Sequence, residues 1–252
     1  MTRVAPSGSP SRRPLAIVAA IVSLALVAGG GYGLWYLFFR PSGPAAIADS
    51  TISLPSTAPG STAPLTGGVS GTWTVDTSIG SFADFTDSWV GYRVQEQLAS
   101  IGGNTAVGRT PDVSGTLTID GSKLTAVDIQ ADLTSLKSDD DRRDGQLARQ
   151  GIQTASFPTA TFKLTTPIDV GSVPADGQEV SVTATGDLTL HGQTKSVQFP
   201  LKAKLSGSTI IVTGSLDIAF ADYGIEKPNS FMVLSIADTG TIELQLFFTK
   251  SA

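Results

Sequence analysis

The chain of 252 residues is 40% hydrophobic and only 15% charged, which allows one globular domain with additional segments. It has no cysteine and one histidine, His191, which excludes disulfides, thiolate chemistry and metal sites rich in cysteine or histidine. The net charge of −5 is uneven, because the first 40 residues carry four arginines and no acid, whereas the rest carries 13 Lys and Arg against 22 Asp and Glu. An acidic domain repels phosphate groups, so we expect no binding to nucleic acid.

The first predicted element is an apolar helix over residues 15–39, which contain no charged side chain. These 25 residues would span roughly 37 Å as a helix, enough to cross a bilayer with some tilt. Tyr32, Trp35 and Tyr36 gather near one end, as in an interfacial aromatic belt. A cleaved secretory signal is the alternative, but the apolar run is long for one and no A-x-A-type site follows promptly. We therefore expect an uncleaved, single-pass anchor in the plasma membrane.

Basic residues predict the orientation of this anchor. Three arginines and the α-amino group precede the apolar helix, and Arg40 alone follows it. The positive-inside rule then places residues 1–14, expected to be a disordered tail, in the cytoplasm and the remainder outside the cell membrane.

Residues 40–70 are predicted to be a disordered linker. They are rich in Pro, Ser, Thr, Ala and Gly and lack the apolar content for a core. A stalk of this kind would let a domain move tens of ångströms from the membrane and return. The folded domain is expected over residues 71–252.

Within residues 71–252, apolar and polar residues alternate with the period of half-buried β-strands. Asp120-Gly121 and Ser206-Gly207 are hairpin signals between such runs. The only good helix candidate is 138–152, with acids in its first turn after Ser138 as the expected N-cap. Eight or nine antiparallel strands with one apolar face predict an all-β sandwich or closed barrel, and periodicity does not choose between them.

Four motifs, in chain order, decide the fold by resemblance: GTWTVD, RRDGQLARQGIQTASFPTATFKL, ATGDLTLHGQTKSVQFPL and ADYGI. Together they resemble the YceI-like family of polyisoprenoid-binding domains, over about residues 71–250. The resemblance implies an eight-stranded antiparallel, lipocalin-like barrel with a long apolar tunnel that holds an isoprenoid chain, and an extracytoplasmic location. The chain departs from the family at FADYGI, where many members have an arginine before the acid, and at residues 88–110, a longer excursion than usual. Both departures concern the ligand more than the fold.

We therefore predict a site for an isoprenoid quinone or another polyprenyl-type lipid, with no cofactor and no metal. Apolar side chains that point into the barrel would form it, and small residues such as Gly186 and Gly214 would leave a lumen. The alternative is a packed core with no room inside. The predicted ligand-binding residues are Trp73, Phe82, Trp89, Tyr92, Val94, Leu133, Arg143, Phe157, Phe162, Leu188, Phe199, Leu201, Ile218, Phe220, Leu244 and Leu246.

Arg143 is the one charged residue in this set. It could guard the pocket mouth and meet a ligand head group, or form an ordinary ion pair with Asp144 or with an acid of the preceding Asp run. The Asp run lacks the ligand spacing of a calcium loop and is interpreted as helix-capping charge.

His191 decides whether an enzyme is expected. A catalytic base needs a nucleophile and an orienting carboxylate, and no G-x-S-x-G elbow occurs. Gly192, Gln193 and Thr194 after it predict a tight turn, so we expect a strand-end histidine that bonds to backbone. The expected function is lipid binding, for storage or transfer, without catalysis. The alternatives are acyl or phosphoryl transfer, and a packed barrel that presents segments 98–112 and 221–232 to a protein.

Overall fold

The computed structural model describes residues 44–47, 54, 68–99, 102–229 and 233–251. The chain divides into two compact units, Met1–Ser42 and Gly43–Ala252, and all described residues belong to the second. The predicted tail and the predicted anchor lie outside the described residues. In the part of the chain that is described, no helix is long and apolar enough to cross a membrane.

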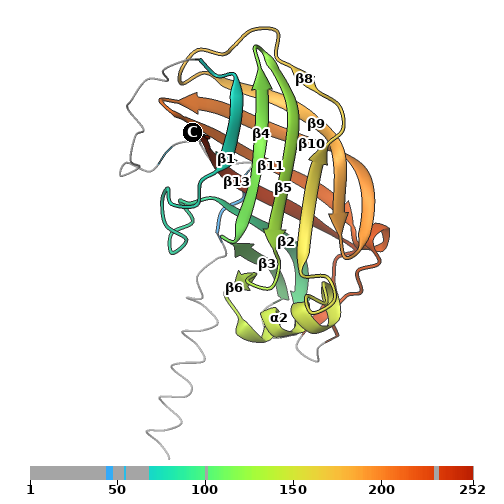
Figure 1. Cartoon of the computed structure of the whole chain (residues 1–252). Helices are drawn as coiled ribbons and strands as arrows, with labels where there is room; N and C mark the ends of the chain where they lie inside the picture. Colours follow the sequence, from blue (N-terminus) through green and yellow to red (C-terminus); the bar gives the residue numbers. More distant parts are fainter. Residues whose placement is uncertain (1–43, 48–53, 55–67, 100–101, 230–232, 252) are drawn as a thin grey trace, which may run out of the picture. The chain divides into compact units, whose positions relative to one another are not determined.

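Eight of the described strands form a closed antiparallel barrel (Figure 1). The ring closes because β13 pairs with β11 along one edge and with β1 along the other. The predicted barrel is confirmed. In ring order the strands are β1 (Gly71–Val75), β4 (Val113–Asp120), β5 (Lys123–Asp132), β7 (Thr159–Leu164), β9 (Glu179–Leu190), β10 (Gln193–Ser206), β11 (Thr209–Ala219) and β13 (Thr239–Lys250).

A smaller group of strands continues from β13 toward one end of the barrel. The first part of β13 pairs with β2 (Trp89–Leu98), which pairs in turn with β3 (Gly102–Thr110). β6 (Lys137–Ser138) pairs with β3, and β12 (Val233–Ile236) pairs with the far end of β2. At the other end of the barrel, the short β8 (Ile168–Asp169) pairs with the start of β5 (Figure 1). The two ends of the barrel are therefore built differently.

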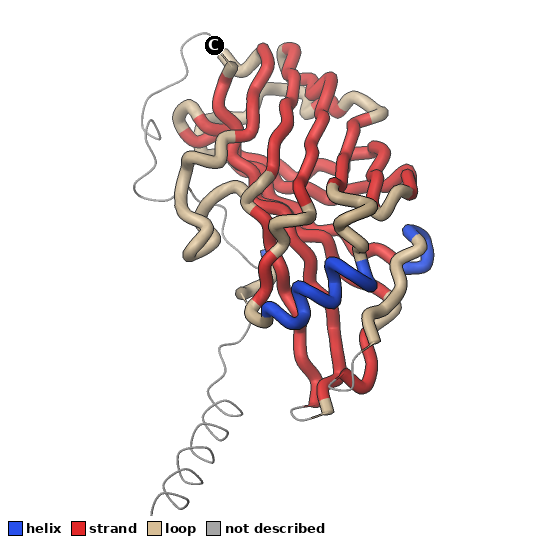
Figure 2. Tube along the Cα trace, turned by 60° about the horizontal axis from the view of Figure 1, so that its bottom comes forward, coloured by secondary structure: helices blue, strands red, loops and turns tan. Residues whose placement is uncertain are grey.

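The predicted helix forms at the end where β2, β3 and β6 lie (Figure 2). It consists of α2 (Asp141–Gln146) followed by a π-helical turn, η2 (Leu147–Gly151). Asp140, and not Ser138, is the N-cap: its Oδ1 accepts from the N–H of Arg142 at 2.8 Å. Ser138 belongs to β6, and its hydroxyl donates to Asp144 Oδ1 at 2.6 Å. A 3₁₀ turn, η3 (Phe220–Tyr223), follows β11.

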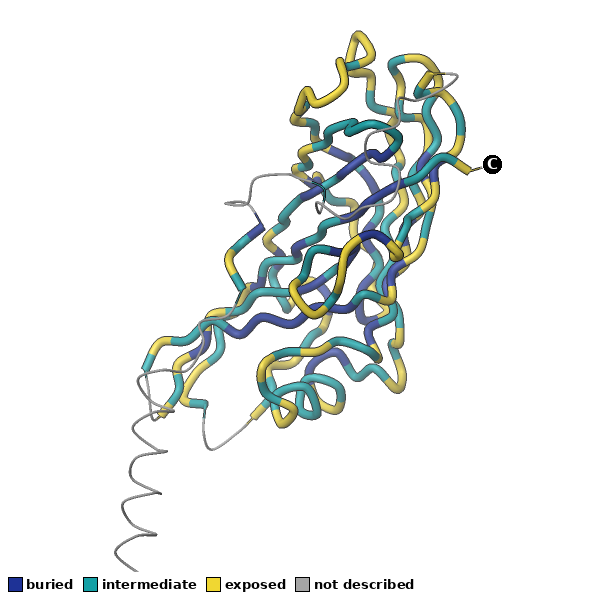
Figure 3. The backbone as a smooth tube through the Cα atoms, turned by 90° about the vertical axis from the view of Figure 1, so that its left-hand side faces the viewer, coloured by how far each residue is buried: buried dark blue, intermediate teal, exposed yellow. Residues whose placement is uncertain are grey.

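Burial alternates along the strands, as Figure 3 shows, and the inward side chains form two clusters. The cluster nearer β8 contains Trp73, Val113, Leu117, Ile129, Ile210, Leu246 and Phe248. The cluster nearer α2 contains Leu133, Ile152, Leu188, Leu190, Ile218 and Tyr223. The alternation in the sequence therefore becomes a hydrophobic core inside the ring.

Large side chains pack over two inward-facing glycines, so these positions do not add free space as we expected from the sequence. A Cβ atom on Gly186 would lie 2.5 Å from Cζ of Phe162. On Gly214 it would lie 2.5 Å from Cδ2 of Leu201 and 3.1 Å from Cε1 of Phe199. The Phe162 and Phe199 rings contact each other edge to face, with centroids 6.1 Å apart. Each glycine thus receives a large side chain of a neighbouring strand, which fills the space beside it.

A third cluster lies outside the barrel, where the loop 76–88 covers β11 and β13. Ile79 of the loop packs against Ile211 and Phe247, which face away from the barrel interior. The Ser88 hydroxyl donates to the Asp76 carbonyl at 2.8 Å and accepts from the Phe247 N–H at 2.9 Å. These bonds fix the loop on the outer face of the sheet.

Replacing Gly186 by alanine should destabilise the barrel. The new Cβ would lie 2.4 Å from the Lys163 carbonyl oxygen and 2.5 Å from the Phe162 ring, so both would have to move. We expect urea denaturation to show a loss of about 1–3 kcal/mol in the free energy of unfolding. Gly103→Ala is the control, because its nearest group is the Gln97 amide oxygen at 3.9 Å, and it should change stability by less than about 0.5 kcal/mol. Equal losses in the two variants would contradict the packing argument.

Asp87, in the same outer loop, predicts a pH dependence of stability. It is 4% exposed, and burial raises its pKa from 3.8 to about 6. The folded state therefore binds this proton more tightly than the unfolded state, and the contribution of Asp87 to stability falls as the pH rises from about 4 to about 6. Asp87→Asn removes this titration, so it should raise the free energy of unfolding relative to wild type more at pH 7 than at pH 4. Denaturation at the two pH values tests this, and an equal difference at both would show that Asp87 is not responsible.

Candidate functional site

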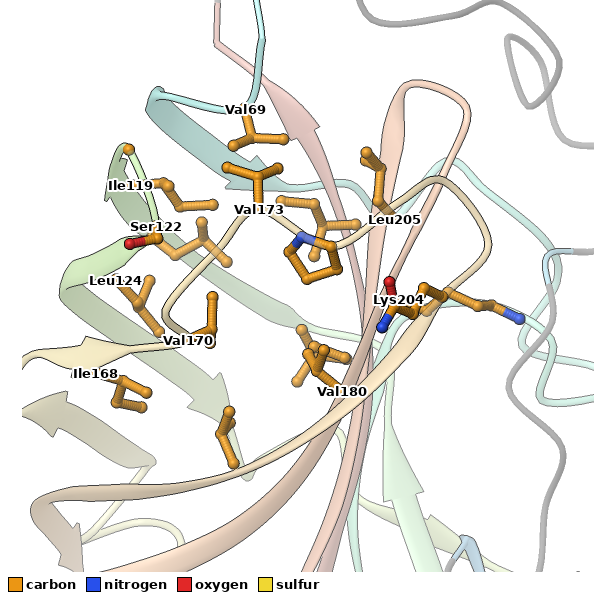
Figure 4. Close-up of a pocket in the computed structure, with 18 residues that line it drawn as sticks. Val69, Ile119, Ser122, Leu124, Ile168, Val170, Val173, Val180, Lys204 and Leu205 are labelled. Atoms are coloured by element: carbon orange, nitrogen blue, oxygen red, sulfur yellow. The ribbon is translucent and has the colours of Figure 1, made fainter.

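An apolar pocket of about 130 Å³ lies at the end of the barrel away from α2 (Figures 1 and 4). Inward side chains of five barrel strands form its wall, together with Val69 just before β1. The strand residues are Leu117, Ile119, Leu124, Val180, Val182, Ala203, Leu205, Ile210 and Val212. They continue the alternating pattern of their strands to the rim of the barrel.

The connection between β7 and β9 forms a cap over this pocket. It contributes Ile168, Val170, Val173 and Pro174 to the lining, and Figure 4 shows Val173 lying across the opening between Val69 and Leu205. Val170 and Val173 are nevertheless 36% and 48% exposed. Apolar side chains that are shared between a pocket and the solvent mark a place where an apolar molecule can contact the protein.

Asp169 attaches the cap to the barrel. Its Oδ1 accepts from the Gly171 N–H at 2.8 Å and from the Ser122 hydroxyl at 2.9 Å, and both bonds lower the pKa of the Asp169 carboxyl. Ser122 lies in the turn that joins β4 and β5. The Val170 N–H also donates to the Ser122 carbonyl at 3.1 Å.

At the other end of the cap, the Gly177 N–H donates to the Leu205 carbonyl at 2.8 Å and Asp176 accepts from the Gly207 N–H at 2.8 Å. The cap is therefore attached at both ends, and Val173 lies between the two attachments.

Polar side chains are few around the pocket. The lining includes Ser122, Gln178 and Lys204. The first bonds to Asp169 and the second accepts from the Ala175 N–H at 3.1 Å, so both hold the cap. Figure 4 shows the Lys204 side chain extending away from the apolar residues. The pocket thus offers apolar contact with little hydrogen bonding, which suits a hydrocarbon chain.

The described pocket borders the hydrophobic core of the barrel. Leu117 and Ile210 line the pocket and also belong to the cluster around Trp73, which is fully buried. Farther toward α2, the Phe162 and Phe199 rings lie over two inward-facing glycines, Gly186 and Gly214. The pocket therefore occupies one end of the barrel interior.

His191 lies in the turn between β9 and β10, as the sequence predicts. It has a φ of 51°, and its ring packs on Phe157 with centroids 4.3 Å apart. Its Nδ1 lies 3.0 Å from the Tyr223 carbonyl oxygen and must donate, because a carbonyl only accepts. The predicted bond to backbone is confirmed, and it joins the β9–β10 turn to η3.

Residues 73–248 match the sequence model of the YceI-like domain. The chain belongs to the YceI-like family. No curated protein matches this chain. The fold of this YceI-like chain is similar to that of a polyisoprenoid binding domain from Saccharophagus degradans, implicated in plant cell wall breakdown, with a TM-score of 0.54 and 22% identity over 71% of this chain and 98% of that one. It also resembles Burkholderia cenocepacia BcnA, with a TM-score of 0.48 and 22% identity over 64% and 95% of the two chains. The Campylobacter jejuni YceI protein is similar with a TM-score of 0.47 and 17% identity, over 57% of this chain and 85% of that one.

None of the sixteen residues predicted to bind the ligand lines this pocket of the YceI-like barrel. Most of them instead point into the barrel below it. Trp73, Leu244 and Leu246 belong to the cluster nearer β8, and Leu133, Phe162, Leu188 and Ile218 to the cluster nearer α2. Phe199 and Leu201 lie over Gly214, and Val94 and Phe220 lie over Gly240. Their inward position is observed, and their role in binding a ligand stays a prediction.

Phe82 and Trp89 lie outside the barrel, so the expectation that they point inward is wrong. Trp89 pairs with Gln245 on the face opposite to Val90 and Leu244, and its indole N–H donates to the Phe85 carbonyl at 3.2 Å. Phe82 lies in the outer loop and contacts Phe85 edge to face. Segment 98–112, considered as a binding loop, is largely strand β3.

Tyr92 and Arg143 lie at the α2 end, far along the barrel from the pocket (Figure 1). Arg143 donates to Glu96 Oε1 at 2.7 Å and also forms an ion pair with Asp139. An acid of the Asp run is thus one partner, as expected, but the second partner is Glu96 of β2. Tyr92 packs over Gly108, and burial raises the pKa of its hydroxyl. Arg143 therefore does not guard the mouth of this pocket.

The residues that line the pocket follow the same alternation in the sequence as the predicted ones, but their side chains are smaller, and we had favoured large side chains. Val180, Val182 and Leu205 lie in the same alternating runs as the predicted residues. The valines of the cap stand among Gly, Ser, Pro and Asp, where apolar residues are unusual. Valines in such a polar loop indicate that the loop packs on an apolar surface.

Arg143→Ala should destabilise the protein, because it leaves the buried Glu96 carboxylate without its charged partner. Glu96 retains a hydrogen bond from the Asn104 amide at 2.6 Å, so we expect a loss of roughly 2–3 kcal/mol in the free energy of unfolding. Arg142→Ala is the matched control, because the neighbouring Arg142 is exposed, and it should change stability by less than about 0.5 kcal/mol. Chemical denaturation measures both, and a small effect of Arg143→Ala would show that the pair is too solvated to matter.

Proposed function

We propose that this YceI-like protein binds the hydrocarbon chain of a lipid in the pocket beneath Val170 and Val173. The observation that carries the proposal is the aliphatic lining, open toward a cap whose two valines are partly in solvent. A dry apolar site of this kind gains its affinity from removing hydrocarbon from water, with no need for specific polar groups.

The size of the pocket limits what it holds in the described state. A cavity of about 150 Å³ accepts one benzene-sized molecule, and the pocket is about 130 Å³. It therefore accommodates about one branched five-carbon unit. Burying five carbons gains roughly 4 kcal/mol, which corresponds to a dissociation constant near 1 mM.

Tighter binding requires that more of the chain be buried. Two or three five-carbon units would bring the dissociation constant to the micromolar range or below, if the gain per carbon stays the same. The cap is the element that can make room, because Val170 and Val173 already contact solvent and Val173 lies between the attachments at Asp169 and Asp176. We infer that a longer chain enters by displacing the cap.

The proposed ligand class is an isoprenoid quinone or another polyprenyl-type lipid. The structurally similar domain from Saccharophagus degradans is described as polyisoprenoid binding, which supports this class. The wall of branched Val, Ile and Leu side chains also suits the methyl branches of such a chain. A role in storage or transfer, without catalysis, agrees with a pocket lined mainly by aliphatic side chains.

The proposal extends to the location of the domain. The uncharged segment 15–39 and the arginines before it favour a single-pass plasma-membrane anchor, with its N-terminus in the cytoplasm and the barrel outside. A lipid-binding domain tethered in this way would remain close to the membrane that supplies its ligand.

Val180→Trp tests the pocket, because an indole at this position would occupy the space of the ligand. The full chain, purified and reconstituted in lipid nanodiscs, is titrated with radiolabelled farnesol. We expect the dissociation constant to rise at least tenfold relative to wild type. Organic extraction and mass spectrometry of the purified wild-type chain identify the lipid carried from the cell.

Glu179→Trp is the matched control, since the adjacent Glu179 is exposed on the outer face, and it should bind farnesol as wild type does. A folded Val180→Trp variant that binds farnesol as tightly as wild type would refute the assignment of the pocket.

A further inference from the structure

The outer face of β2, β3 and β13 carries charged side chains that are buried, although they point away from the barrel interior. Glu243 is 1% exposed and Arg109 4% exposed. Glu243 Oε1 lies 3.2 Å from Arg93 Nε, and its Oε2 lies 3.9 Å from Arg109 Nη2. Outward charges on a barrel are normally solvated, so a covering element is required.

Residues 44–47, from the predicted linker, cover this cluster. The Ile47 N–H donates to Glu243 Oε1 at 3.1 Å. Arg93 donates to the Pro44 carbonyl at 2.8 Å, and Arg109 to the Ala45 carbonyl at 3.4 Å. One acceptor and two donors of the barrel thus bind the backbone of this short segment at three points.

The Ile47 side chain gives the segment an apolar anchor. It is 5% exposed and borders a groove of about 340 Å³ on the barrel. Burying an isoleucine side chain gains on the order of 1.5–3 kcal/mol. The segment therefore combines an apolar anchor with charge-assisted hydrogen bonds, a combination that holds an extended chain in one register.

The barrel side of this contact is rigid. The Arg109 guanidinium lies over the Trp89 ring at 3.8 Å and the Phe85 ring at 4.5 Å. These rings, fixed by the outer loop, hold Arg109 in place for Glu243 and for the Ala45 carbonyl. The binding groups are thus largely in position without rearrangement.

A second point of attachment lies farther along the same strand. Leu54 packs against the outer cluster of Ile79, Ile211 and Phe247. Phe247 follows Glu243 by four residues on the outward face of β13, roughly 13 Å along the strand. Both described pieces of the chain before residue 68 therefore lie on the outer side of the same strand.

We propose that residues 44–47 and Leu54 act as a strap that fastens the linker to the outer face of β13. The strap divides the sequence of the predicted stalk, so that only residues 40–43 separate it from the apolar segment 15–39. Four residues span at most about 14 Å, against tens of ångströms for a free linker of thirty. This consequence rests on the proposed membrane anchor, whereas the strap itself does not.

Hydrogen exchange on the full chain in nanodiscs tests the strap. In wild type, the Ile47 amide, which donates to Glu243, should exchange at least tenfold more slowly than in an unstructured peptide of the same sequence. Ile47→Asp removes the apolar anchor and places a second carboxylate beside Glu243, so this protection should be lost. Leu234→Asp adds the same charge at a position that is 68% exposed and should leave the protection intact.

Farnesol titration of the same variants separates the strap from the lipid site. Ile47→Asp should bind farnesol as wild type does, which shows that the barrel is folded. Fast exchange of the residue 47 amide in wild type, or unchanged protection of that amide in a folded Ile47→Asp variant, would overturn the strap without touching the proposed lipid binding.

Discussion

The volume inside a closed ring of eight strands is the constraint on which the rest of this structure depends. Once β13 pairs with β1, each inward side chain competes with its neighbours for a fixed space. The chain resolves this competition by placing glycine beside large residues of the neighbouring strand, as at Gly186 with Phe162 and at Gly214 with Leu201. Among the described residues, the apolar pocket beneath the cap lies where small aliphatic side chains reach the rim.

The fold could be predicted from the sequence because its causes are local and repeated. Strand alternation, the hairpin turns and the acids at the start of α2 all act over a few residues, and the family motifs fix their order. The interior could not be predicted in the same way. Whether Gly214 leaves a gap depends on the rotamers of Leu201 and Phe199 on the neighbouring strand, which the spacing along one strand does not specify.

The outward orientation of Trp89 and the aliphatic lining of the described pocket were missed for identifiable physical reasons. Trp89 and Tyr92 are separated by three residues in one strand, so the period of two puts them on opposite faces, and only Tyr92 faces inward. We had selected Trp89 for the size of its aromatic side chain, without applying this alternation. Size also favoured Phe162 and Phe199 over Val180 and Val182, although large rings are the residues that fill a barrel and small branched ones those that leave a pocket.

The linker shows the limit of composition as a guide. A segment rich in Pro, Ser and Thr cannot form a hydrophobic core of its own. It can nevertheless bind the surface of a folded domain that offers apolar contacts and hydrogen-bonding groups. Ile47 and Leu54 are among its few large apolar residues, and each lies against a prepared site on β13. Those sites exist because β13 presents Glu243 and Phe247 outward, where a free-standing barrel would carry solvated residues. Glu243 is charged, points outward and is buried, which indicates that another part of the chain covers that face. This indication appears only once the strand register is known.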